Sequence, residues 1–227
     1  MSLTTGRGPL SAKPAGRFNS PVPTGLVYTE PWRRRVRGIV GGRVVVDSEQ
    51  VLLVHRQGEP PSYAFPQADA VGVPAEADPA AAGYVRIRWD DVDAWYEEEE
   101  QVFMHPRNPF HRVDCVRTTR RVTVRVAGVV LVDSDDTVGV YETSLEPRLY
   151  VGRDQVRLDL LQASRTTTYC PYKGTASYWD AVIGQDRVAD VAWSYEDPLP
   201  ESMQLRGLLA FDPSKAAVDQ ELAPPAW

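Results

Sequence analysis

Apolar and polar residues alternate along several short stretches of this chain. In residues 121–126 valine occupies every second position, as expected of a strand with one buried face. Ala127-Gly128 predicts a hairpin turn into residues 129–132, and residues 133–136 predict a second turn before 137–141. This pattern predicts a meander of three antiparallel strands.

The same pattern occurs twice. Residues 33–70 align without a gap on residues 119–156, at a constant offset of 86. Identical positions cluster in the string Val-x-Val-Asp-Ser, which ends at Ser48 in the first copy and at Ser134 in the second. We therefore predict two copies of one supersecondary unit, with the same strand connectivity. Because each copy has an apolar face to cover, we expect the two copies to pack against each other.

The copies diverge after residue 70. The first has a low-complexity loop, then a predicted strand at 84–89 and one short helix at 90–100 with Asp90 or Asp91 at its N-cap. The second continues with predicted strands at 155–161, 166–170, 177–183, 187–193 and 205–211.

These patterns predict an all-β protein of two related antiparallel units. We expect a flexible tail at residues 1–20, a degenerate N-terminal copy at 21–116 and a complete C-terminal copy at 117–227.

Composition narrows the class of protein. The hydrophobic share of 43% and the charged share of 25% are typical of soluble globular proteins. The sequence has no apolar run of about 18 residues and no secretory signal pattern at its start, so we expect a cytoplasmic protein without a membrane partner. Cys115 and Cys170 are too few for a disulfide scaffold or a Cys-rich zinc site, and we expect neither metal nor cofactor.

The net charge of −6 is unevenly distributed, with a basic cluster at residues 33–37. Such a cluster can bind nucleic acid, but arginines that alternate along a strand also form an ordinary solvated face. We favour the solvated face and do not expect a nucleic-acid partner.

The segment Cys170-Pro171-Tyr172-Lys173-Gly174 is the most distinctive one for chemistry. Proline and glycine predict a tight turn that presents Cys170 and Lys173 from a fixed loop. A nearby ammonium favours the thiolate, so Cys170 and Lys173 are candidate catalytic residues. The alternatives are a buried thiol and a solvated lysine, and Lys173 is also a candidate contact for an anionic ligand.

Aromatic residues surround this turn in the sequence. We predict that they form a ligand cleft, although a plain hydrophobic core is the alternative, above all for Trp179. Candidate ligand-binding residues are Lys173, Tyr172, Trp179, Trp193, Tyr195, Thr168, Arg107 and His111.

The second half also resembles a known family. The residues that carry the resemblance are Asp133-Ser134, Thr166-Thr167-Thr168-x-Cys170-Pro171-x-Lys173-Gly174, Ser177-Tyr178-Trp179, Ala192-Trp193-x-Tyr195 and Pro198. This combination is similar to the uncharacterised bacterial domain of unknown function 427, DUF427, and the first half looks like the degenerate partner in tandem members.

The resemblance implies a β-tent-like fold, in which two antiparallel sheets are pinned together at one end, often by zinc on paired Cys-x-x-Cys turns. Here the corresponding turn has Lys173 in a ligand position, which implies that the metal is lost. The family is sometimes labelled nucleotidyltransferase-like, but no Gly-rich phosphate loop of the Walker type occurs in the sequence.

We therefore expect a protein that binds a small anionic or aromatic metabolite in one polar-aromatic pocket around the turn. The alternatives are an enzyme for acyl, group or nucleotidyl transfer that uses Cys170 and Lys173, and a structural or assembly protein. The sequence leaves an oligomer open.

Overall fold

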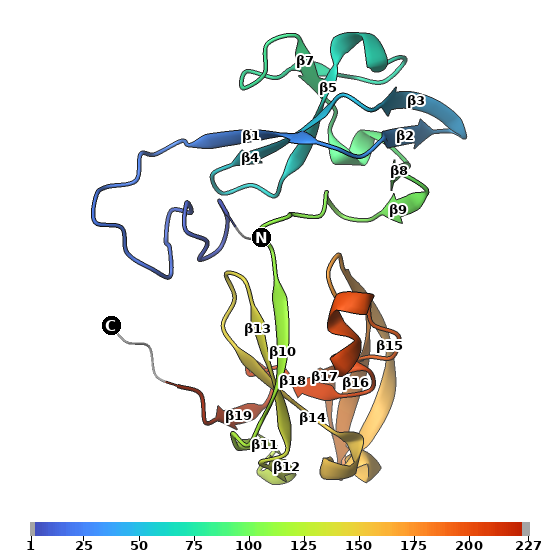
Figure 1. Cartoon of the computed structure of the whole chain (residues 1–227). Helices are drawn as coiled ribbons and strands as arrows, with labels where there is room; N and C mark the ends of the chain where they lie inside the picture. Colours follow the sequence, from blue (N-terminus) through green and yellow to red (C-terminus); the bar gives the residue numbers. More distant parts are fainter. Residues whose placement is uncertain (1–2, 224–227) are drawn as a thin grey trace. The chain divides into compact units, whose positions relative to one another are not determined.

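The computed structural model describes residues 3–223, in two units that divide between His111 and Arg112 (Figure 1). The predicted division, after residue 116, lies within a strand. Antiparallel strands build both units, so the all-β class is confirmed. Within residues 3–223 no helix is long and apolar enough to cross a membrane.

The first unit contains two sheets. One has the strand order β1-β4-β5-β7-β6 and the other the order β3-β2-β8-β9. The elements are β1 (Val27–Trp32), β2 (Val36–Val40), β3 (Arg43–Ser48), β4 (Val51–Arg56), β5 (Ser62–Pro66), the 3-10 helix η1 (Gln67–Asp69), β6 (Glu76–Ala77), β7 (Tyr84–Arg86), the 3-10 helix η2 (Trp89–Asp91), β8 (Ala94–Glu97) and β9 (Glu100–Val102).

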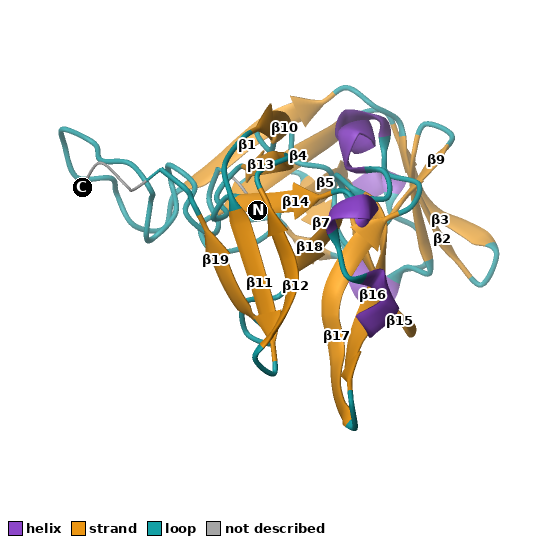
Figure 2. Ribbon diagram, turned by 90° about the horizontal axis from the view of Figure 1, so that it is seen from below, coloured by secondary structure: helices purple, strands orange, loops and turns teal. Residues whose placement is uncertain are grey.

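The second unit also contains two sheets. The large sheet has the order β10-β13-β14-β18-β17-β16-β15, and the small sheet, whose strands lie side by side in Figure 2, has the order β12-β11-β19. The elements are β10 (Val113–Thr118), β11 (Val122–Val126), β12 (Val129–Ser134), β13 (Thr137–Glu142), β14 (Arg148–Val151), the 3-10 helices η3 (Arg153–Gln155) and η4 (Leu158–Leu160), β15 (Leu161–Cys170), β16 (Gly174–Ile183), β17 (Asp186–Tyr195), the 3-10 helix η5 (Pro200–Leu205), β18 (Leu209–Phe211) and β19 (Ala217–Gln220).

The two units share a frame of strands with the same register, formed by β1–β5 in the first unit and β10–β14 in the second. In the first unit Val36 pairs with Ser48, and in the second Val122 pairs with Ser134, at the offset of 86 found in the sequence. The same offset relates the pairings β1–β4 and β10–β13, as well as β4–β5 and β13–β14. The strand connectivity predicted from the repeat is therefore confirmed.

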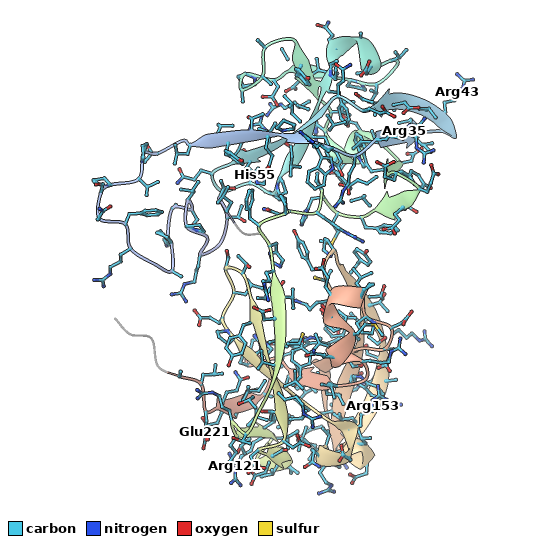
Figure 3. The ribbon with its side chains drawn as sticks, viewed as in Figure 1. Arg35, Arg43, His55, Arg121, Arg153 and Glu221 are labelled. Atoms are coloured by element: carbon cyan, nitrogen blue, oxygen red, sulfur yellow. The ribbon has the colours of Figure 1, made fainter. Side chains whose placement is uncertain are left out.

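Side chains repeat along with the backbone. Arg35 forms a bidentate ion pair with Asp47, at 2.7 and 2.5 Å, and Arg121 forms one with Asp133 at 2.6 and 2.7 Å. Figure 3 labels both arginines. In the hairpin that follows β11, Ala127 and Gly128 have φ of 47° and 80°. Positive φ at both central residues is the conformation that a two-residue hairpin turn requires.

The predicted meander is wrong in one respect. β11 and β12 pair as a hairpin, but β13 leaves them and joins the large sheet between β10 and β14. The backbone N–H of Asp136 donates to Ser134 Oγ at 3.1 Å in the turn that redirects the chain. Buried residues on both faces of β13, among them Thr137 and Val140, explain its place inside a sheet.

The helix predicted at 90–100 is also wrong beyond its first turn. η2 ends at Asp91, and the chain then forms the hairpin of β8 and β9. β8 pairs with β2 and buries Trp95 and Glu97 with the period of two of a strand. As a strand, β8 forms backbone hydrogen bonds with the edge of β2. A helix would instead place adjacent acidic side chains close together, where they repel one another.

Between β14 and β18 the second unit contains an excursion, residues 152–208, which includes the ten-residue strands β15, β16 and β17. The predicted strands at 166–170, 177–183 and 187–193 lie within these three strands. The predicted strand at 155–161 is instead mostly 3-10 turns, and only the end of 205–211 is a strand. In the first unit β5 is followed by a shorter connection that includes β6.

Apolar residues fill the space between the sheets of each unit. In the first unit Phe65 and Trp95 stack, with ring centroids 5.8 Å apart. In the second unit a cluster that includes Val124, Leu131 and Val191 covers one face of the large sheet. The opposite face of the large sheet carries a second apolar cluster and the candidate site.

Part of the segment predicted as a flexible tail, residues 1–20, contacts the rest of the first unit. The Gln57 side chain donates to the Leu10 carbonyl at 2.9 Å, and the Gly58 N–H donates to the Thr4 carbonyl at 2.9 Å. Thr4, Thr5 and Ser11 are buried. The polar segment uses its carbonyl groups to pack on the first unit, and residues 1 and 2 lie outside the described part.

Candidate ligand-binding site

One face of the large sheet gathers polar and aromatic side chains from separate parts of the sequence. Val138 pairs with Tyr150, and Tyr178 pairs with Trp193, in the register of the sheet. Directly paired residues point to the same face, and alternate residues along a strand do so too. Tyr195 therefore follows Trp193 on this face, opposite the cluster that fills the space between the two sheets.

The turn at residues 170–174 is fixed against the segment that leads into η5. The Leu199 N–H donates to the Lys173 carbonyl at 3.1 Å, and Ser202 Oγ donates to the Tyr172 carbonyl at 3.2 Å. Gly174 has φ of +93°, which glycine adopts without the strain of a side chain. Two hydrogen bonds from residues 199–202 thus hold the turn, and Lys173 has a defined position.

Lys173 Nζ donates to a carboxylate oxygen of Glu142, and each of the two side chains is only 10% exposed. Glu142 ends β13, two positions after Val140 on the same face of the strand. The partner of the ammonium is therefore Glu142, whereas the sequence placed Lys173 beside Cys170. Cys170 lies at the end of β15 and packs against the apolar cluster of this face.

Trp193, Tyr150 and Arg148 form the second part of the site. Trp193 Nε1 donates to the Tyr150 hydroxyl oxygen at 2.9 Å, and the two rings meet edge to face with centroids 6.2 Å apart. The Arg148 guanidinium lies 5.1 Å from the centroid of the Trp193 ring and donates to the Phe211 carbonyl at 2.9 Å. These contacts fix the indole and place a cation over its face.

Burial keeps the phenols of this face protonated. Removal from water raises the pKa of Tyr150, and the nearby Glu142 carboxylate adds to the effect. The pKa of Tyr195 is raised in the same way, first by burial. Both hydroxyl groups therefore retain their protons at neutral pH, and the proton of Tyr150 can be donated because its oxygen accepts from Trp193.

These side chains surround a cavity of about 390 Å³, which we call the aromatic cavity. This volume lies toward the lower end of the range of small-molecule sites, about 300–1,000 Å³. The lining contains carboxylates and cations as well as rings: Val140, Glu142, Leu145, Glu146, Arg148, Tyr150, Lys173, Tyr178, Trp193, Tyr195 and Asp212.

Three of the predicted ligand-binding residues, Lys173, Trp193 and Tyr195, meet in the aromatic cavity. Thr168 is not part of the lining, but its hydroxyl is 3.1 Å from the hydroxyl of Tyr178, which is. Tyr172 is 6% exposed and belongs to the apolar cluster of this face.

Trp179 lies on the other face of β16. Its Nε1 donates to Ser194 Oγ at 3.0 Å, and the Arg153 guanidinium, labelled in Figure 3, covers its ring at 5.0 Å. Neighbouring residues of a strand point in opposite directions, so Tyr178 and Trp179 cannot both face the cavity. The core alternative considered for Trp179 agrees with this position.

Arg107 and His111 belong to the first unit. Arg107 lines a hollow there together with Arg34 and residues 97–102. His111 is 8% exposed. Neither residue is part of the lining of the aromatic cavity.

Glu142, Arg148 and Tyr150 escaped the sequence analysis. A charged residue at 142, which follows Val138 and Val140 in the inward positions of an alternating strand, is the signal that could have identified the first of them. Arg148 and Tyr150 continue the same face on the neighbouring strand.

The first unit differs at the equivalent positions of its frame. Arg56 corresponds to Glu142 and forms an ion pair with Asp78, at 2.6 Å, so the charge is reversed. Ser62 and Ala64 correspond to Arg148 and Tyr150, and Ser62 accepts from Arg56. The shared frame is thus present without the arginine and the aromatic residues of the site.

A metal is not suggested by the donor groups. Within residues 3–223 no group of three or more His, Cys, Asp or Glu side chains is placed to hold an ion. Cys115 and Cys170 are both free thiols, and burial raises the pKa of Cys115.

Comparison with known proteins relates part of the chain to a family. No curated protein matches the chain. A family model matches residues 114–223, a segment that begins in β10 and includes every residue lining the aromatic cavity. That segment matches the family described as a domain of unknown function, DUF427.

Proposed function

We propose that the second unit binds a small planar aromatic anion in the aromatic cavity. The observation that carries the proposal is the arrangement of Arg148 over the ring of Trp193, at the wall of a cavity that Tyr178 and Tyr195 also line. A flat ring packs on such side chains, and a guanidinium orients a carboxylate or a similar group.

Arg148 is the anion partner in this proposal. A guanidinium has five N–H donors, and the bond to the Phe211 carbonyl uses one of them. Lys173 has a different task, because its ammonium is neutralised by Glu142. The ion pair supplies a polar wall that limits the size of the ligand.

We also propose that the first unit is a shortened copy of the same domain, without its binding site. The shared register and the repeated Arg–Asp pairs support common ancestry of the two frames. Arg56 and Asp78 pair where the second unit has Glu142, so the first unit retains the frame alone.

Titration with benzoate, followed by the fluorescence of tryptophan, tests the proposed function. Arg148→Met should weaken binding by roughly ten- to a hundredfold, since a hydrogen-bonded charge contributes about 1.5–3 kcal/mol. Arg117→Met is the matched control, because Arg117 lies on the same unit, is 84% exposed and does not line the aromatic cavity. Equal loss in both variants, or no binding of benzoate or other aromatic acids to the native protein, contradicts the proposal.

A further inference from the structure

A second cavity, of about 570 Å³, lies on the same face of the large sheet. We call it the apolar cavity, because Val116, Val138 and Leu208 contribute to its lining together with the Cys115 thiol. The remaining lining residues are Arg117, Asp136, Thr137, Tyr150, Gly152 and Gln204.

The two cavities are neighbours across the side chain of Tyr150, which lines both. Cys115 in the apolar cavity pairs with Val140 in the aromatic cavity, and Val138 precedes Val140 by two positions on the same strand. The cavities therefore occupy consecutive register positions of one sheet face, about 7 Å apart along β13.

The charged groups of the apolar cavity lie at its rim, whereas the buried Thr137 hydroxyl donates to the Arg120 carbonyl at 2.8 Å. Arg117 and Asp136 are 84% and 69% exposed, with 3.4 Å between the charged atoms. Gln204 is exposed as well, whereas Tyr150 is 3% exposed. An apolar lining with a charged rim suits a hydrocarbon group.

We propose that the ligand is an amphipathic aromatic acid whose apolar tail passes Tyr150 and fills the apolar cavity. This inference rests on the proposed function, because the ring and the anionic group occupy the aromatic cavity. Tyr150, with Trp193 as donor to its oxygen, has an O–H left for an acceptor on the ligand at the junction of the two cavities.

The test compares benzoate, para-butylbenzoate and para-octylbenzoate. Each buried methylene contributes about 0.8 kcal/mol, roughly a fourfold gain in affinity, so the butyl compound should bind at least tenfold more tightly than benzoate. Leu208→Trp, which fills the apolar cavity, should abolish this gain and leave the affinity for benzoate unchanged. Gln204→Trp fills the rim from an exposed position and replaces Leu208→Trp if that variant does not fold. Leu158→Trp, at an exposed leucine outside the lining of both cavities, is the control.

The thiols give an independent readout. Para-octylbenzoate should slow the alkylation of Cys115 by iodoacetamide at least tenfold, whereas benzoate should not, and Cys170 serves as the internal reference. Equal affinity for the three acids, or equal protection of Cys115 by benzoate and by the octyl compound, overturns this inference and leaves the proposed function intact. Binding of none of the acids overturns both. A gain in affinity that persists in the filled variants also overturns the placement of the tail.

Discussion

The Lys173 ammonium and the Glu142 carboxylate form an ion pair inside the second unit, with each side chain 10% exposed. The rigid turn therefore positions Lys173 for an ion pair within the protein. It does not hold an unpaired ammonium ready for a ligand. This relationship changes what a substitution of Lys173 should do to the protein.

Lys173→Met and Glu142→Gln should each destabilise the protein by about 3–5 kcal/mol, because each removes one member of a buried ion pair and leaves the other charge in the interior. The double variant should lose less than the sum of the two, since it leaves neither charge in the interior. Urea unfolding measures all three free energies. Free energies of unfolding that simply add in the double variant contradict a coupled pair.

Acid should weaken the second unit through Asp180. The Asp190 backbone N–H, at 2.7 Å, and then the Arg187 guanidinium lower the pKa of its carboxyl below the usual value. A lowered pKa in the folded state stabilises the protein above the unfolded pKa of about 3.9, and this stability is lost as the pH falls further. Asp180→Asn should thus be less stable at neutral pH and lose less stability between about pH 5 and 2, as measured by urea unfolding. A variant with the acid profile of the native protein contradicts this role.

The first unit should lose stability at a higher pH, through His55. This side chain is 0% exposed, and burial lowers its pKa although Glu30, at 3.1 Å from Nε2, acts in the opposite direction. The unfolded state takes up a proton near pH 6.5 and the folded state only below that, so stability falls as the pH drops below about 6.5.

Titration of the His55 ring protons by NMR should give a midpoint below the usual range. His55→Phe, next to Phe110 and Tyr28, should remove this part of the pH dependence. A midpoint at or above about 6.5 would show that Glu30 outweighs burial.

Gly174→Ala should destabilise the turn that carries Lys173. A side chain at φ of +93° is strained, and its Cβ would lie 3.4 Å from the Asp197 carbonyl oxygen. We expect a cost of about 1–2 kcal/mol or more in urea unfolding. At Gly184, with φ of +62° and open space around it, alanine should cost less. A larger loss at Gly184 than at Gly174 is the outcome that refutes this reading of the turn.

The hairpins of the frame could be predicted from the sequence because neighbouring residues specify them. Alternating valines and the turns after residues 40 and 126 specify each hairpin, and the repeat specifies them twice. The sheet that β13 joins depends on partners far away in the sequence, which no local pattern contains. The same reason explains the wrong helix prediction for β8. Its acidic residues suggested a helix, whereas its pairing with β2 depends on a strand far away in the sequence.

The lining of the aromatic cavity was predicted in part, for a related reason. Attention to the segment absent from the first copy identified Lys173, Trp193 and Tyr195. The opposite wall comes from Glu142, Arg148 and Tyr150, on strands that both copies share. Their contribution depends on how the excursion folds back over the frame, which spacing in the sequence does not specify.

The excursion between β14 and β18 has a consequence for how such a protein can change. Its long strands attach to a frame that the first unit forms without them. Residues 152–208 also supply part of the core of the second unit, among them Ala181, Val191 and Ala192. Substitutions at their cavity-facing positions should therefore change the proposed ligand preference with less effect on folding than substitutions at their core positions. The chain carries, in one polypeptide, a frame with a long excursion and a similar frame without it, so the first unit is an internal reference for the effect of the excursion and of the proposed binding site on stability.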